Sequence, residues 1–302
     1  MVTPPLPSAG VFPALWMPTD RDGRIIESAI RDNVAYLKRC GAHGLMVLGS
    51  TGEFPYFSVD EREELLRRVT EWVAPLPVLA NISDISPRVV ARLARAARES
   101  GCASVAILPP WYFSITQADL LEFFLRAAEA AAPLPVFLYN FPERVGTAIL
   151  PETMADFAER APLAGIKLSG GAWELHGEVM ALARAKGFSV LTGWDTRLAD
   201  AMTLGCSGCI SGLSNFVAEP IVAAFKACQA GDAAAAAMAT RELRETAALL
   251  GGLSFPHDVP AGMAARGFVV GEPKQALSAA TRTAREGVTA ALRVQFRQRG
   301  WI

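Results

Sequence analysis

The chain has 302 residues, of which 51% are hydrophobic and 20% are charged, and its formal net charge is −1. This composition is typical of a globular protein and excludes a disordered or fibrous chain. A net charge near zero provides no field for a nucleic-acid backbone, and no apolar run reaches transmembrane length. We therefore expect neither nucleic acid nor a membrane as a partner.

The cysteines and the first residues bear on the cellular compartment. The chain contains five cysteines, an odd number that argues against a disulfide framework. Residues 1–10 are rich in proline and lack the basic and apolar parts of a secretory signal. We therefore expect reduced thiols and a cytoplasmic protein.

Short apolar segments alternate with longer amphipathic segments along most of the chain. Eight segments have the character of strands: Phe12–Met17, Gly44–Leu48, Val78–Asn81, Ser104–Leu108, Val136–Tyr139, Gly165–Leu168, Ser189–Thr192 and Cys209–Ser211. The segments between them have the pattern of helices: Glu27–Cys40, Val59–Val73, Pro87–Ser100, Gln117–Ala131, Pro151–Arg160, Glu174–Lys186 and Thr196–Leu204. The expected N-caps are Ser58, Ser86, Thr116 and Asp195.

This alternation predicts an α/β fold, a (β/α)8 TIM barrel. An open doubly wound sheet is the alternative, although it usually has fewer strands and a glycine-rich first turn. After the eighth strand the patterns are helical only, at Glu219–Ala230, Ala233–Leu250 and Lys274–Arg299. We expect residues 1–226 to form the barrel that carries the active site, and residues 227–302 to form a C-terminal helical extension.

Lys167 stands near the end of an apolar predicted strand, where barrel enzymes place their reactive groups. An ammonium group is costly to bury unless it is paired, and a desolvated amine can attack a ketone to form an imine. A lysine that reaches solvent or pairs with a carboxylate is the alternative. The other lysines all fall in predicted helices, where a solvated surface role suffices: Lys38, Lys186, Lys226 and Lys274.

Tyr139 ends the strand that precedes the strand of Lys167. Because neighbouring parallel strands end side by side, the phenol is expected to reach the lysine and to transfer protons during imine chemistry. A half-buried tyrosine bonded to the backbone is the simpler interpretation of an isolated tyrosine.

Two loops offer binding groups for anions. The segment Gly49–Glu53, which we call the cradle, follows the second strand. A carboxylate could bind to its backbone amides, including that of Gly52, and to the hydroxyls of Ser50 and Thr51. Arg144 follows Tyr139 and suits a second carboxylate in bidentate fashion. An ordinary turn and a solvated loop arginine are the respective alternatives.

Taken together, these motifs resemble the dihydrodipicolinate synthase / N-acetylneuraminate lyase family of class I (Schiff-base) aldolases. The resemblance covers nearly the whole chain and rests on motifs that occur in family order. They are the cradle, Tyr139-Asn-Phe-Pro142, Gly165-Ile-Lys167, Gly193-Trp-Asp195 and Gly208-Cys-Ile-Ser211.

The resemblance implies a role for each matching residue. Lys167 is then the Schiff-base residue, Tyr139 the proton-transfer phenol, and the cradle hydroxyls the carboxylate site and proton relay, while Gly193 and Ile210 contribute to substrate binding. Tyr112 matches a tyrosine that reaches into the neighbouring subunit's site, which implies a homodimer or homotetramer. The family needs no metal or organic cofactor, because the lysine imine is itself the electron sink.

The resemblance implies pyruvate or a related 2-oxo acid and an aldehyde as substrates. Arg144 favours the reaction of 4-hydroxy-tetrahydrodipicolinate synthase, which joins pyruvate to aspartate semialdehyde. The chain departs from that pattern at Ser50, Leu168 and Trp194. The alternatives are an aldolase for 4-hydroxy-2-oxoglutarate, N-acetylneuraminate or a 2-keto-3-deoxy sugar acid, a sugar-acid dehydratase that uses the same lysine, and a non-catalytic 2-oxo acid sensor.

No metal site is expected. Cys206 and Cys209 have C-x-x-C spacing, but the sequence offers no second pair and no nearby histidine to complete a zinc site.

Overall fold

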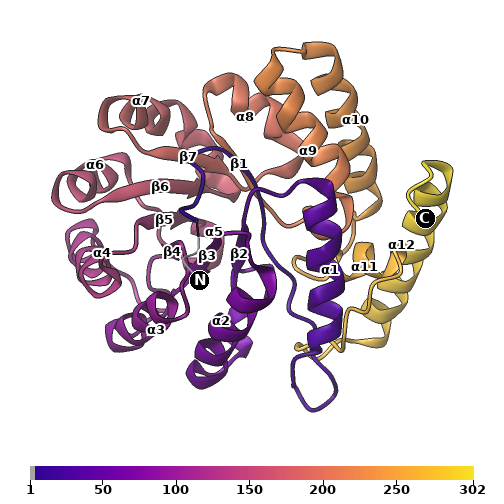
Figure 1. The fold of residues 1–302 in the computed structure, drawn as a ribbon, viewed down its shortest axis with the longest axis horizontal. Coiled ribbons are helices and arrows are strands. Elements are labelled where there is room, and N and C mark those ends of the chain that lie inside the picture. Colours follow the sequence, from indigo (N-terminus) through magenta and orange to yellow (C-terminus); the bar gives the residue numbers. More distant parts are fainter. Residues whose placement is uncertain (1–3) are drawn as a thin grey trace.

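A computed structural model describes residues 4–302 and places eight parallel strands inside a ring of helices (Figure 1). The strands are β1 (Gly10–Pro13), β2 (Leu45–Val47), β3 (Val78–Asn81), β4 (Ser104–Ile107), β5 (Val136–Asn140), β6 (Leu163–Leu168), β7 (Ser189–Thr192) and β8 (Gly208–Ser211). They are paired in the order β1-β8-β7-β6-β5-β4-β3-β2. A bridge between Ala14 and Met46 joins β1 to β2 and nearly closes the barrel, so the predicted fold is confirmed.

Each strand is followed by a helix that covers the outside of the barrel (Figure 1). These helices are α1 (Glu27–Cys40), α2 (Val59–Val73), α3 (Pro87–Glu99), α4 (Gln117–Ala131), α6 (Pro151–Arg160), α7 (His176–Lys186), α8 (Leu198–Leu204) and α9 (Ser214–Ala230). Short helical turns lie in the connecting loops: η1 (Phe54–Tyr56), α5 (Pro142–Val145), η2 (Gly170–Leu175) and η3 (Asp195–Arg197).

The predicted N-caps are confirmed in part. Ser58 forms a capping box, because its hydroxyl accepts a hydrogen bond from the Glu61 N–H while the Glu61 carboxylate accepts one from the Ser58 N–H. The Thr116 hydroxyl caps α4, whereas Ser86 occupies the N-cap position of α3 without a side-chain bond. Asp195 is no N-cap, since its carboxylate accepts a hydrogen bond from the β8 loop instead.

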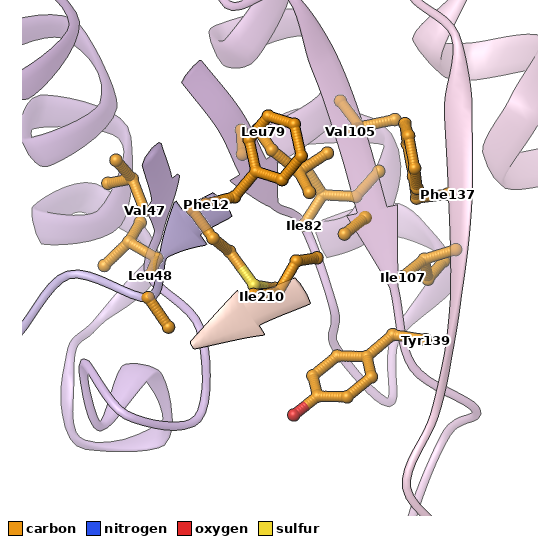
Figure 2. Close-up of a cluster of buried hydrophobic side chains, with 14 of the residues drawn as sticks. Phe12, Val47, Leu48, Leu79, Ile82, Val105, Ile107, Phe137, Tyr139 and Ile210 are labelled. Atoms are coloured by element: carbon orange, nitrogen blue, oxygen red, sulfur yellow. The ribbon is translucent and has the colours of Figure 1, made fainter. Parts of the chain in front are cut away.

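Large apolar side chains fill the barrel below its mouth. Figure 2 shows Phe12, Leu79, Val105 and Phe137 converging from different strands. Gly165 of β6 pairs with Phe137 of β5, and a methyl group at this glycine would overlap the phenyl ring. Because the inside of the barrel is closely packed with apolar side chains, the polar side chains of β5 and β6 lie at the carboxyl ends of these strands.

The C-terminal extension consists of α10 (Ala233–Leu249), α11 (Asp258–Ala265) and α12 (Ala279–Gln298), with α10 packed against α9 and α11 against α12. Three details of the prediction after the eighth strand are wrong. Helix α9 begins at Ser214 rather than Glu219. Helix α11 was not expected, and α12 begins at Ala279 rather than Lys274, because Ser278 provides its N-cap. The predicted boundary after residue 226 falls within α9, and the division into two units stays a prediction. No helix within residues 4–302 is long and apolar enough to cross a membrane.

Candidate active site

The carboxyl ends of the strands surround a cavity of about 510 Å³, which we call the main cavity. Its walls come from the strand ends, from the loops that follow them and from the C-terminal extension. The structure brings together these predicted site residues along its walls: Thr51, Tyr139, Arg144, Lys167, Gly193 and Ile210.

Lys167 and Tyr139 are direct neighbours across β5 and β6. The lysine Nζ lies 3.9 Å from the centroid of the tyrosine ring, so the amine rests on the aromatic face. Lys167 is only 5% exposed and Tyr139 1%, which excludes a lysine that extends freely into solvent. The pair places a buried amine and a phenol in one cavity.

Gly193 makes room for Lys167. A methyl group at this position would lie 3.2 Å from the lysine Cε and would overlap the hydroxyl of Ser169. The glycine thus leaves space for the side chains of Lys167 and Ser169 at the end of β7. Ile210 lies on the inner face of β8 and contributes an apolar wall.

The cradle is a tight turn beside Tyr139. The Glu53 N–H donates to the Ser50 carbonyl at 3.0 Å, and the Ser50 hydroxyl lies 3.4 Å from the Tyr139 hydroxyl. Leu48 and Glu53 both have left-handed backbone, with φ of 58° and 55°. Such strain in residues other than glycine persists only where surrounding contacts hold it. Here the buried Asn81 amide donates to the Leu48 carbonyl at 2.7 Å.

Gly52 does not line the main cavity. Its backbone packs against the loop after β1, where a methyl group would lie 2.9 Å from the Leu15 carbonyl and 3.1 Å from Met17 Cγ. The glycine therefore permits the cradle to approach β1 closely.

Lys274 contradicts the prediction of a solvated helical lysine. It lies in the loop before α12, where its ammonium donates to a Glu53 carboxylate oxygen at 2.9 Å and to the Met17 carbonyl at 2.6 Å. Both side chains of this ion pair are almost fully buried. The prediction failed because the segment is not helical and crosses back to the barrel mouth.

Arg144 lies in α5 at the rim of the main cavity. Its guanidinium carbon is 5.5 Å from the Phe141 ring centroid and 5.1 Å from that of Phe255, which orients the group between two aromatic faces. Arg144 also lines an adjoining cavity of about 270 Å³, to which Ser50 contributes.

Tyr112 is not brought to the site of its own chain. It is 86% exposed, has a left-handed φ of 81° and forms a T-shaped pair with Phe113 at 4.8 Å. It does not line the main cavity.

The predicted site residues did not include two acidic side chains that line the main cavity. The Asp195 carboxylate accepts a hydrogen bond from the Leu213 N–H at 3.1 Å, and burial raises its pKa to about 6 against the opposing charge of Lys167. Burial also raises the pKa of Asp258, the first residue of α11. The position of Asp195 directly after a strand was a usable signal, whereas Asp258 lies in the unpredicted helix.

The structure shows no group of three or more histidine, cysteine or acidic side chains suited to a metal ion anywhere in residues 4–302. Cys206 and Cys209 are buried, and burial raises the pKa of both thiols. Thiols in such surroundings are poor nucleophiles.

Comparisons with known proteins agree with this architecture. The chain is 33% identical over 223 residues to the 4-hydroxy-tetrahydrodipicolinate synthase of Natronomonas pharaonis, covering 74% of this chain and 76% of the relative. It is 30% identical to an uncharacterised DapA-like lyase of Halobacterium salinarum, covering 88% and 87%. The crystal structure of YagE from Escherichia coli K12, in complex with pyruvate, superposes with a TM-score of 0.88 at 26% identity, covering 97% and 99%.

The chain is a class I lyase or aldolase. This class is defined by the parallel barrel, by the lysine in the cavity at its carboxyl end and by these relatives. The model of the dihydrodipicolinate synthetase family matches residues 7–295, and the chain belongs to this family. The resemblance inferred from the motifs is confirmed.

Proposed function

We propose that Lys167 forms a Schiff base with pyruvate or a related 2-oxo acid, and that the chain acts most like 4-hydroxy-tetrahydrodipicolinate synthase. The main support for this proposal is the buried Lys167 amine, which lies 3.9 Å from the Tyr139 ring centroid. Both residues line the main cavity, as does Thr51 of the cradle. A relative of 33% identity bears that name, and the YagE crystals contain pyruvate.

In the proposed mechanism, the Lys167 amine attacks the keto carbon of pyruvate, and the resulting carbinolamine loses water to give an imine. The Tyr139 hydroxyl, 3.4 Å from that of Ser50, supplies the proton for the departing water. The protonated imine withdraws electrons from the methyl carbon, which loses a proton to the Tyr139 phenolate left by the preceding step. The resulting enamine attacks the aldehyde carbon, and the aldehyde oxygen takes the proton from Tyr139. Hydrolysis then releases the product and the free amine, so the lysine imine serves as the electron sink without a cofactor.

The cradle and Arg144 divide the recognition of carboxylates in this proposal. The hydroxyl of Thr51 and the backbone of the cradle hold the carboxylate of pyruvate. Arg144, held between Phe141 and Phe255 at the rim, takes the carboxylate of aspartate semialdehyde.

Replacing Arg144 tests the identity of the second substrate. We expect Arg144→Ala to lower kcat/KM for aspartate semialdehyde by about 10- to 100-fold, because a charge-assisted bidentate contact is lost. Trapping of the pyruvate imine by borohydride should stay unchanged. Arg126→Ala, on the exposed face of α4, is the control. Equal loss of both activities would refute the role of Arg144.

The acidic side chains of the main cavity favour a second candidate, cleavage or dehydration of a hydroxylated 2-oxo acid. Asp195 and Asp258 both line the cavity that holds Lys167, and carboxylates are suitable acceptors for substrate hydroxyls. Incubation with 4-hydroxy-2-oxoglutarate, N-acetylneuraminate and 2-keto-3-deoxy sugar acids separates the possibilities. Release of pyruvate indicates an aldolase, and water loss without pyruvate indicates a dehydratase.

We further propose a cytoplasmic homodimer or homotetramer. The cysteines are all free thiols, which supports a reducing compartment. The exposed Tyr112 supports a subunit contact, because it lies outside the main cavity of its own chain.

A further inference from the structure

The loop of residues 270–275, which we call the strap, connects the C-terminal extension to the mouth of the barrel. The Trp16 indole N–H donates to the Val270 carbonyl at 3.0 Å, and the Glu272 N–H donates to the Thr19 carbonyl at 2.7 Å. The strap is therefore fixed along the loop that follows β1.

Lys274 is the residue by which the strap reaches the cradle. Its ammonium lies 2.9 Å from a Glu53 carboxylate oxygen, with only 6% and 3% of the two side chains exposed. The ammonium also lies 4.8 Å from the Trp16 ring centroid and 5.3 Å from that of Phe57. Burial lowers the pKa of Lys274, while the charge of Glu53 opposes this change. Loss of one partner would leave the other charge buried and unpaired.

This ion pair holds one end of the cradle, and Asn81 holds the other. Asn81 donates to the Leu48 carbonyl directly before the cradle, and Glu53 is the last residue of the cradle itself. Ser50, which lines the adjoining cavity, and Thr51, which lines the main cavity, lie between these fixed points. If the Glu53 carboxylate moved outward to regain water, the hydroxyls would move with it.

We propose that Lys274 is a positioning residue that fixes the cradle for the carboxylate of the 2-oxo acid. This inference rests on the proposed function. In this proposal the C-terminal extension contributes to substrate binding, because Lys274 holds the carboxylate site through Glu53, which is 221 residues away in the sequence.

Steady-state kinetics of Lys274→Met test the inference. Methionine keeps most of the side-chain volume but removes the charge, so we expect KM for pyruvate to rise by about 10- to 100-fold with a much smaller change in kcat. Lys274→Arg retains the charge and should bring KM back toward that of the wild type. Kinetics are measured at a temperature where circular dichroism shows each variant to be folded.

Arg266→Met is the matched control. It breaks the ion pair between the buried Arg266 of the extension and the partly exposed Glu219 of α9, which does not contact the cradle. We expect it to lower stability without changing KM for pyruvate. If folded Lys274→Met has the KM of the wild type, or if Arg266→Met raises KM equally, the pair serves stability alone and the inference is wrong. If wild-type protein forms no imine with pyruvate, the proposed function itself fails.

Discussion

Asp195 is the residue whose buried charge most directly connects the active site to stability. Its pKa is raised by burial from 3.8 to about 6, and its partners come from the loop after β8. Below pH 3.8 the carboxyl is protonated in both the folded and the unfolded chain. As pH rises through about 6, the folded chain must bury a negative charge, and stability is lost.

Asp195→Asn removes this pH-dependent cost. We expect the free energy of unfolding of the variant, relative to the wild type, to increase by about 2 kcal/mol between pH 4 and pH 7.5. Urea unfolding of both proteins at the two pH values measures this difference. A difference that is equal at both values would mean that folding does not raise the pKa of the Asp195 carboxyl.

The proximity of Lys167 and Tyr139 was predictable because the signals for it are local. Lys167 stands in an apolar strand, and Tyr139 ends the strand before it, so strand pairing alone brings them together. Asp258 gives no such signal, because its place at the cavity depends on how α11 packs after the barrel is complete.

At the scale of elements, helices with clear caps and apolar periodicity were predicted to the residue. Helix α2 spans Val59–Val73 as expected, since Ser58 and Glu61 form a capping box at its start. Helices α1, α4 and α6 also have their predicted bounds, although only α4 of these three has a side-chain N-cap. The periodicity of the apolar residues within each segment determines these elements locally.

The strap and the start of α12 were not predictable in this way. The bond from Trp16 to Val270 joins residues 254 positions apart, and the ion pair of Lys274 joins residues 221 apart. The sequence pattern alone predicts that Lys274 lies in a helix and is solvated, like the other lysines outside the strands. Only the folded barrel reveals that its segment returns to the mouth and lies beside the cradle.

At the scale of the whole molecule, the exposed aromatic pair predicts self-association. Tyr112 is 86% and Phe113 74% exposed, and both project from the loop after β4. Adjacent exposed aromatic rings are typical of protein interfaces.

Sedimentation velocity tests the assembly. We expect a particle of at least twice the chain mass of 32.2 kDa. If the tyrosine serves the site of a neighbouring subunit, as we propose, Tyr112→Ala lowers kcat. Met238→Ala, at an exposed apolar residue of α10 that lines neither cavity, is a control for general surface effects. A fully active monomer, or unchanged kcat in Tyr112→Ala, would contradict the proposed contact.

The central claim is that the Lys167 amine condenses with a carbonyl. Borohydride reduction of the folded protein in the presence of pyruvate, followed by mass spectrometry of its peptides, tests this claim most directly. We predict a reduced pyruvate adduct on the peptide that carries Lys167, absent without pyruvate and absent from Lys167→Ala. An adduct on Lys38 or Lys226 instead, or no adduct on active protein, would contradict the mechanism.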